Sequence, residues 1–481
     1  MITLYIALPL AVVLLLNLSP RRTANALSLW CGLVLTVFAG AYTLAMPHVP
    51  GLADAFDPAN RVLQWKIEAG NLAGVMFLSI ALVVFSAFWV GRYLIADSNR
   101  RFIFNNLLLL CMTGMNGIVL SNDLFTLYVF LEVVAASSFI LIALERTNAG
   151  LEGAFKYVLL SAVATVLVLS SMALIFVLVG SLDYGTVKAV LTSGQLDAAT
   201  SRFVTFAIGL FVVGLFIKGG MVPFHGWLPD AYSSAPTASS VLLGGIVTKA
   251  AGVFTLIQLA QNVFGWDKPS PVLLAVGTLS IAVGAFAALG QRNFKRMLAY
   301  SSISQIGYII IGLGAANEVA VVGAILHLFN HSTFKTLLFV NSAAVEKQAG
   351  TVDMDKLGGL ANKMPVTGFT SVLAMLSTAG VPPLSGFWSK LLIVLGVWLS
   401  GAHAVAVTAI LLSVVTLAYF LSMQRRVFFG RLAPGLEGVK EAGGWLLVPE
   451  IVLAVITLGL GLTMPWFFNT FLVPLRSLWS L

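Results

Sequence analysis

The stretch KGGMVPFHGW, residues 218–227, interrupts an apolar run that extends from 202 to 232. That run is too long for one plain crossing of a bilayer, and its glycines and proline would break a helix at this point. A second long run, 365–399, contains GVPPLSGF at 380–387, which aligns without gaps to residues 220–227, 160 residues earlier. Interrupted helices at matching positions are typical of inverted-repeat transporters, whose binding sites lie at the breaks.

The rest of the chain has the composition of a polytopic helical membrane protein. Of its 481 residues, 59% are hydrophobic and 10% are charged, whereas a soluble domain is usually about 25% charged. No alternating pattern persists that would indicate a β-barrel. The first run lacks the cleavage site of a signal peptide, so it is interpreted as a span. Apolar runs predict about fourteen spans in a single transmembrane domain, 1–481: 2–18, 25–46, 71–94, 101–120, 122–144, 155–180, 202–232, 237–262, 270–290, 296–315, 318–344, 365–399, 404–424 and 445–471.

The basic residues predict how these spans are oriented. Seventeen Lys and Arg residues, Lys295 among them, lie at the joints that follow odd-numbered spans, and six lie on the opposite side. Because positive residues favour the cytoplasmic side, both termini are expected on the non-cytoplasmic side of the cell membrane. The other four basic residues fall inside predicted spans: Lys218, Lys249, Lys335 and Lys390.

Further ionisable side chains also fall inside spans. In HLFNHSTFK, residues 327–335, His327, His331 and Lys335 follow one another at a spacing of four. One face of a helix would therefore carry a column of three protonatable groups about 12 Å tall. Glu132 is interpreted as the one buried carboxylate of the chain. The four lysines and this glutamate would cost roughly 15 kcal/mol if all were charged and unpaired, so they must pair, reach water or become neutral.

These residues predict a path for protons. A carboxylate that approaches or leaves a buried lysine changes whether the lysine keeps its proton, so Glu132 is expected to control Lys218. Imidazole exchanges protons near neutral pH, so the two histidines are expected to pass protons to Lys335. A static ion pair or a side chain that reaches the membrane surface is the structural alternative for any one of these residues. His225, inside the first break, is interpreted as either a gate or a helix cap.

Other chemistries have less support from the sequence. His327 and His331 point the same way on a helix, whereas haem with two histidine ligands needs them on opposite faces. The chain has no clustered metal-ligand pattern and no phosphate or dinucleotide fingerprint, so no cofactor, metal or nucleic acid is expected. Six charged residues near span ends are expected to reach water: Asp123, Asp230, Glu450, Glu145, Glu152 and Lys156.

Four stretches resemble the antiporter-like subunit family: SNDLFTLYVFLEVVAASSFILIAL (121–144), GLFIKGGMVPFHGWLPDAYSSAPTASSVLLGGIVTKAAGV (214–253), HLFNHSTFKTLLFV (327–340) and GVPPLSGFWSK (380–390). This family includes the ion-pumping subunits of respiratory complex I, the A and D subunits of Mrp sodium/proton antiporters, and their relatives in membrane-bound hydrogenases. The resemblance covers nearly the whole chain.

The resemblance implies an all-α polytopic fold of fourteen spans. Spans 4–8 (101–262) and 9–13 (270–424) would form two inverted five-helix repeats, in which helices 7 and 12 are broken. It also implies a role in proton translocation for seven residues: Glu132 and Lys218 as a pair, Lys249 on the central axis, His327, His331 and Lys335 as a relay, and Lys390 as the terminal group.

The resemblance further limits which family member this is. Because the sequence ends shortly after the last predicted span, the protein is expected to lack the lateral helix of L-type complex I subunits and the extra domain of Mrp A. Lys390 stands where M-type subunits usually carry Glu. An Mrp D-type or hydrogenase-type subunit fits best, with an N-type complex I subunit as the alternative. Its expected partners are other membrane subunits of a complex, the lipid bilayer and H⁺, with Na⁺ left open. Whether that complex is a redox-driven translocase also stays open. The rival classes are a self-sufficient carrier for an organic solute and a quinone- or haem-binding redox subunit.

Overall fold

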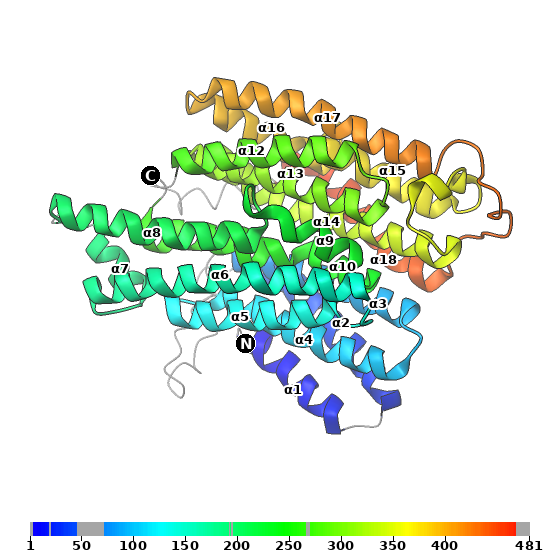
Figure 1. The fold of residues 1–481 in the computed structure, drawn as a ribbon, viewed down its shortest axis with the longest axis horizontal. Coiled ribbons are helices and arrows are strands. Elements are labelled where there is room, and N and C mark those ends of the chain that lie inside the picture. The colour runs from blue at the N-terminus through cyan, green and yellow to red at the C-terminus, as the bar shows by residue number, and fades with distance from the viewer. Residues whose placement is uncertain are drawn as a thin grey trace.

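The structure is a computed structural model that describes residues 3–18, 21–45, 72–191, 193, 196–265 and 270–467. Long helices run beside one another along the longest axis of the molecule (Figure 1). In the first part of the chain these are α1 (Leu4–Leu18), α2 (Arg21–Ala45), α3 (Ala73–Leu94), α4 (Ser98–Leu120), α5 (Leu124–Ile142), α6 (Asn148–Val179), α7 (Tyr184–Leu191), α8 (Ala198–Gly219), α9 (Trp227–Ser234), α10 (Thr237–Leu242) and α11 (Thr255–Leu259). They continue with α12 (Ser270–Leu289), α13 (Phe294–Gly314), α14 (Glu318–Ala349), α15 (Pro365–Ala379), α16 (Ser385–Leu399), α17 (His403–Val427), α18 (Gly444–Leu462) and α19 (Met464–Phe467).

Helix occupies each of the fourteen ranges predicted from the sequence. Ten helical segments of the described residues are long and apolar enough to cross a membrane, so the protein is an all-helical polytopic membrane protein. Parts of four predicted ranges and four of the six basic residues assigned to the outer side lie outside the described residues: 2, 46, 71, 468–471, Arg61, Lys66, Lys268 and Arg476.

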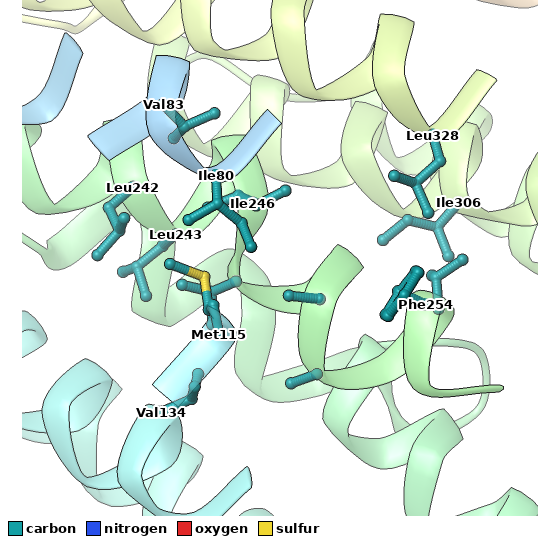
Figure 2. Close-up of a cluster of buried hydrophobic side chains, with 14 of the residues drawn as sticks. Ile80, Val83, Met115, Val134, Leu242, Leu243, Ile246, Phe254, Ile306 and Leu328 are labelled. Carbon is teal, nitrogen blue, oxygen red and sulfur yellow. The ribbon is translucent and has the colours of Figure 1, made fainter. Parts of the chain in front are cut away.

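The helices divide into a buried centre and an outer ring. The most apolar part of Thr237–Phe264 is wholly buried and that of α13 is 94% buried, whereas only 28% of α6 and 33% of α17 is buried. Outer helices therefore present apolar side chains to lipid or to neighbouring subunits. Figure 2 shows the centre, where side chains from α3, α4, α5, α13 and α14 surround the segment after α10: Ile80, Val83, Met115, Val134, Leu242, Leu243, Ile246, Phe254, Ile306 and Leu328.

Equivalent features recur along the chain at a constant distance. The side chain of Thr147 caps α6 and that of Asn317 caps α14, 170 residues later, and both helices end at a left-handed glycine, Gly180 or Gly350. Short antiparallel bridges join Asp123 to Asp183 and Asn293 to Asp353, again 170 residues apart. The two stretches of chain therefore start and stop their helices with the same local chemistry.

The two breaks also share their geometry. At the first, Gly220 takes a left-handed conformation, its N–H bonds to Ile217 O, and the next N–H bonds to Phe216 O. At the second, Gly380 is left-handed, its N–H bonds to Ser377 O, and the next N–H bonds to Leu376 O. These are helix endings that satisfy the last carbonyls, and glycine fits them because it has no Cβ.

Two features of the fold have no counterpart in the sequence-based prediction. The segment after α10 contains three π-helical stretches, η3 (Leu243–Val247), η4 (Lys249–Phe254) and η5 (Ala260–Phe264). A short helix, α7, lies at the opposite end of the molecule from the 428–443 loop (Figure 1). π-Helical turns are rare and occur mostly at functional sites, so the central segment is a place to look for chemistry.

Candidate functional site: a chain of buried ionisable groups

The first part of the site is an ion pair at the break after α8. Lys218, the penultimate residue of α8, donates from Nζ to Glu132 Oε1 on α5 at 3.0 Å. Thr165 on α6 donates to the same oxygen at 2.6 Å. The Lys218 side chain is 4% exposed and that of Glu132 is 34% exposed. The ammonium is thus buried with one carboxylate as its partner, which is the arrangement that can retain or release a proton.

The backbone around the break is itself tied down. Trp227, at the start of α9, donates from Nε1 to Ile217 O across the break at 3.0 Å. The backbone N–H of Val222, in the middle of the break, donates to Ser280 Oγ on α12 at 3.1 Å. His225 lies in a 3-10 turn, Phe224–Gly226, is half-buried, and has an Nδ1 without a hydrogen-bond partner in the described residues. His225 therefore lies within the break, and its geometry agrees with either interpretation, a gate or a helix cap.

Lys249 lies at the start of a π-helical stretch in the centre of the molecule. Its side chain is fully buried and its Nζ donates to Gly244 O, one π-turn earlier, at 2.5 Å. The π-turns coincide with very close packing, because a Cβ on Gly252 would lie 2.4 Å from Gly219 Cα. The residue that follows Lys218 and the segment that carries Lys249 are therefore in direct backbone contact.

The histidine column has the geometry expected from its spacing. The rings of His327 and His331 on α14 stack with centroids 6.2 Å apart and an angle of 15° between their planes. His327 Nδ1 bonds to Ser389 Oγ on α16 at 2.8 Å. His327 Nε2 and both nitrogens of His331 are buried without a partner in the described residues. Buried polar atoms without partners are rare and mark places where water or a proton is handled.

The two lysines of the second half have different surroundings. Lys335 donates from Nζ to Ser301 Oγ at 2.6 Å and to Leu298 O at 3.2 Å, both on α13. Lys390 on α16 lies with its Nζ 4.3 Å from the centre of the Tyr308 ring, and that Nζ has no hydrogen-bond partner in the described residues. An aromatic face stabilises an ammonium only partly, so Lys390 is the less satisfied of the two.

The seven predicted residues form two groups in space. Glu132 and Lys218 make one. In the other, electrostatic interactions link His331 to Lys249, Lys335, His327 and Lys390. The contact between Gly219 and Gly252 links the two groups through the backbone.

Two expectations about charged residues are wrong, and a third residue is more buried than its position suggests. Glu132 is not the one buried carboxylate, since it is one-third exposed whereas Glu450 on α18 is fully buried. Glu450 therefore does not reach water in this structure, although it lies near the end of its helix. Lys295, assigned to a joint, is the second residue of α13 and is 4% exposed; its Nζ donates to Ala235 O and Thr237 Oγ1. Tertiary packing decides each case, and no local sequence signal reports it.

A cluster of ion pairs joins the two halves. Asp230 on α9 bonds to Lys156 on α6 at 2.6 Å and to Arg296 on α13 at 2.5 Å. Lys156 also pairs with Glu152 at 2.6 Å. The Asp230 side chain is 22% exposed, so it is less solvated than expected for a residue near a span end.

The fold and the buried ionisable chain define a membrane protein that handles ions. Residues 121–416 match the family model described as NADH:quinone oxidoreductase/Mrp antiporter, transmembrane. The chain belongs to this family of antiporter-like, ion-translocating membrane subunits. It is 31% identical to the D subunit of the Na⁺/H⁺ antiporter of Alkalihalophilus pseudofirmus over 82% of this chain and 80% of that protein. It is 32% identical to the N subunit of the NADH-quinone oxidoreductase of Desulforudis audaxviator over 88% of this chain and 87% of that protein. The curated relatives are thus divided between the two kinds of complex.

Solved structures give the same result for the fold. A chain of the membrane-bound sulfane sulfur reductase, an archaeal respiratory membrane complex, aligns with a TM-score of 0.87 at 26% identity, over 99% of this chain and 97% of that one. A chain of respiratory complex I from Thermus thermophilus aligns with a TM-score of 0.78 at 28% identity, over 98% and 99%. A chain of the Mrp complex from Dietzia sp. has a TM-score of 0.85 at 24% identity, which supports the fold alone.

Proposed function

We propose that this protein is the proton-translocating subunit of a multi-subunit membrane complex. The observation that carries the proposal is the pair Lys218–Glu132, an ammonium 4% exposed and held by one carboxylate at the break of a membrane helix. When Glu132 moves away, the buried ammonium loses its stabilising partner and releases its proton. The proton then passes by way of Lys249, the histidine column (His327 and His331) and Lys335 to Lys390.

The recurring helix caps support a two-fold architecture. Residues 101–262 and 270–424 are proposed to be two inverted five-helix repeats within fourteen spans. The broken helices are those of spans 7 and 12, at 202–232 and 365–399. The matching endings at Gly220 and Gly380 would then place Lys218 and Lys390 at corresponding breaks. The distribution of basic residues supports an orientation with both termini on the non-cytoplasmic side.

The complex is proposed to be of the Mrp or membrane-bound hydrogenase type, in which this chain would correspond to the D-type or hydrogenase-type subunit. An N-type subunit of complex I is the alternative, supported by the N-type relatives. A tagged pull-down in mild detergent, followed by mass spectrometry, separates these proposals. Redox subunits with iron–sulfur or nickel–iron centres, or quinone-reducing subunits, would indicate a redox-driven pump, and small hydrophobic partners without a redox protein would indicate an Mrp-type antiporter.

The function itself is tested by Glu132→Ala and Lys218→Ala in the assembled complex. Both changes are expected to abolish proton transport into inside-out vesicles, followed with a pH-sensitive dye, while the complex still assembles. Lys356→Ala is the matched control, because the Lys356 side chain is 72% exposed and pairs with Asp353, three residues earlier in the sequence. Wild-type transport in a fully assembled Lys218→Ala complex would refute the proposal.

A further inference from the structure

Glu450 is a buried carboxyl group that the proposed path does not use. It is 0% exposed on α18, and its carboxyl oxygens lie within hydrogen-bond distance of two hydroxyls, 3.4 Å from Thr367 Oγ1 and 3.3 Å from Thr370 Oγ1. Asn341 on α14, also fully buried, approaches it and donates to Thr370 Oγ1 at 2.9 Å. Among the described residues, no Lys, Arg or His side chain pairs with Glu450. A carboxyl group without a cation is stable in such surroundings when it carries a proton.

A second carboxylate connects Glu450 to the surface. Glu441, in the 428–443 loop, is partly exposed and accepts from Thr367 Oγ1 at 2.8 Å and from the backbone N–H of Val366 at 2.7 Å. The Thr367 hydroxyl thus lies between the carboxyl groups of Glu441 and Glu450. A hydroxyl both donates and accepts, so it can pass a proton between two carboxyl oxygens. This loop lies at one end of the molecule (Figure 1), the end assigned to the cytoplasm by its basic residues.

A stripe of hydroxyl groups leads from Glu450 towards the second break. Five buried residues of α15 share one face of that helix, since they follow a spacing of three, four and seven: Thr367, Thr370, Ser371, Ser377 and Thr378. The step from Ser371 to Ser377 is the longest, about 9 Å along the helix axis, and requires a chain of at least two bridging waters. These hydroxyls are the groups on this face of α15 that can accept and donate a proton.

The stripe ends at the groups of the proposed path. Ser377 Oγ lies 3.3 Å from Ser385 Oγ across the break, and Asn330 donates to Ser385 O at 2.8 Å. Ser389, one turn further along α16, holds His327 Nδ1 at 2.8 Å. The next residue after Ser389 is Lys390. Apart from the step between Ser371 and Ser377, polar side chains therefore extend from a carboxylate at the surface to the histidine column and its terminal lysine.

We propose that Glu450 is a proton-binding group on a second access route, from the cytoplasmic surface into the second half of the protein. The route runs from Glu441 by way of the Thr367 hydroxyl to Glu450, then along the hydroxyl face of α15 to His327 and Lys390. It uses α14, α15 and α18, so it is separate from the Glu132–Lys218 pair. The inference rests on the proposed function for its inner end, where the proton is handed over.

The test is Glu450→Gln in the assembled complex, with proton transport measured in inside-out vesicles. Glutamine keeps the size of the side chain and accepts from both threonines but cannot carry a proton, so transport should fall on the order of tenfold or more. Assembly and thermal stability should stay at the wild-type level. Glu437→Gln is the matched control, because Glu437 is exposed to solvent on the 428–443 loop, which also carries Glu441. Thr367→Val should lower transport and Thr367→Ser should restore it.

The outcomes separate this inference from the proposed function. If Lys218→Ala abolishes transport in the same vesicles and Glu450→Gln leaves it unchanged, the second route is refuted and the proposed function stands. If Lys218→Ala has no effect, the proposed function fails. A loss in Glu450→Gln that only parallels lost assembly or stability would assign Glu450 a structural role and overturn the inference. Recovery of Glu450→Gln transport at raised sodium would make the position a sodium site and also overturn it.

Discussion

The contact between Gly219 and Gly252 makes a sharp prediction for Gly252→Ala. A Cβ at residue 252 would lie 2.4 Å from Gly219 Cα and 2.7 Å from Gly219 N, whereas ordinary contact begins at 3.4 Å. Both neighbours are backbone atoms and no side chain can rotate away, so α8 and η4 would have to separate by about 1 Å. Overpacking of this kind costs about 1–3 kcal/mol. The separation would also displace Lys218 and Lys249, which lie one and three residues from the contact.

The expected result is a lower unfolding temperature in detergent together with impaired proton transport in vesicles. Gly209→Ala is the matched control, because Gly209 lies on α8 and a Cβ there meets nothing within 4 Å. Alanine is a better helix former than glycine, so the control should be neutral or more stable by about 1 kcal/mol. Gly252→Ala with wild-type stability and transport would refute the view that this contact positions the two lysines.

Two further predictions concern single polar side chains. Thr165→Val removes the hydroxyl that donates to Glu132 Oε1 at 2.6 Å and should reduce the rate of proton transport severalfold, whereas Thr165→Ser should preserve it; equal transport in the two vesicle preparations would contradict this role. Asp230→Asn weakens the ion pairs to Lys156 and Arg296 and should lower the free energy of unfolding by about 1 kcal/mol, more at low salt than at high salt; a loss of stability that does not depend on salt, measured by thermal unfolding, would argue against an electrostatic origin.

Much of the fold can be predicted from the sequence because a membrane restricts the choice. Backbone groups in lipid must bond within a helix, so apolar length gives the spans, and Gly220 and Gly380 mark the places where helices must stop. The spacing of His327 and His331 also predicts their stacking, since it depends on one helix only. Features that depend on one helix, or on the bilayer, are therefore accessible from sequence.

The rest depends on which helices become neighbours. Glu450 is buried because Thr367, Thr370 and Asn341 from two other helices surround it, and its own segment does not encode that. The π-helical stretches around Lys249 likewise have no distinct composition, and they coincide with Gly244 and Gly252, where the packed neighbours leave no room for a Cβ. The partial exposure of the Glu132 side chain likewise depends on which helices pack against α5. Tertiary contacts have to be known before such residues can be identified.

The contacts that hold the first break bear on the proposal that this protein moves protons and not organic solutes. The segment around the break is held at one end by the ion pair between Lys218 and Glu132, and at the other by the ion pairs of Asp230 with Lys156 and Arg296. Between these ends, Trp227 donates a hydrogen bond across the break. A carrier of organic solutes has to open and close a chamber as wide as its cargo, which requires long, free segments of main chain. Here these contacts hold the main chain around the break in one position. Such an arrangement fits the proposal that the transported species is a proton, which needs no wide chamber.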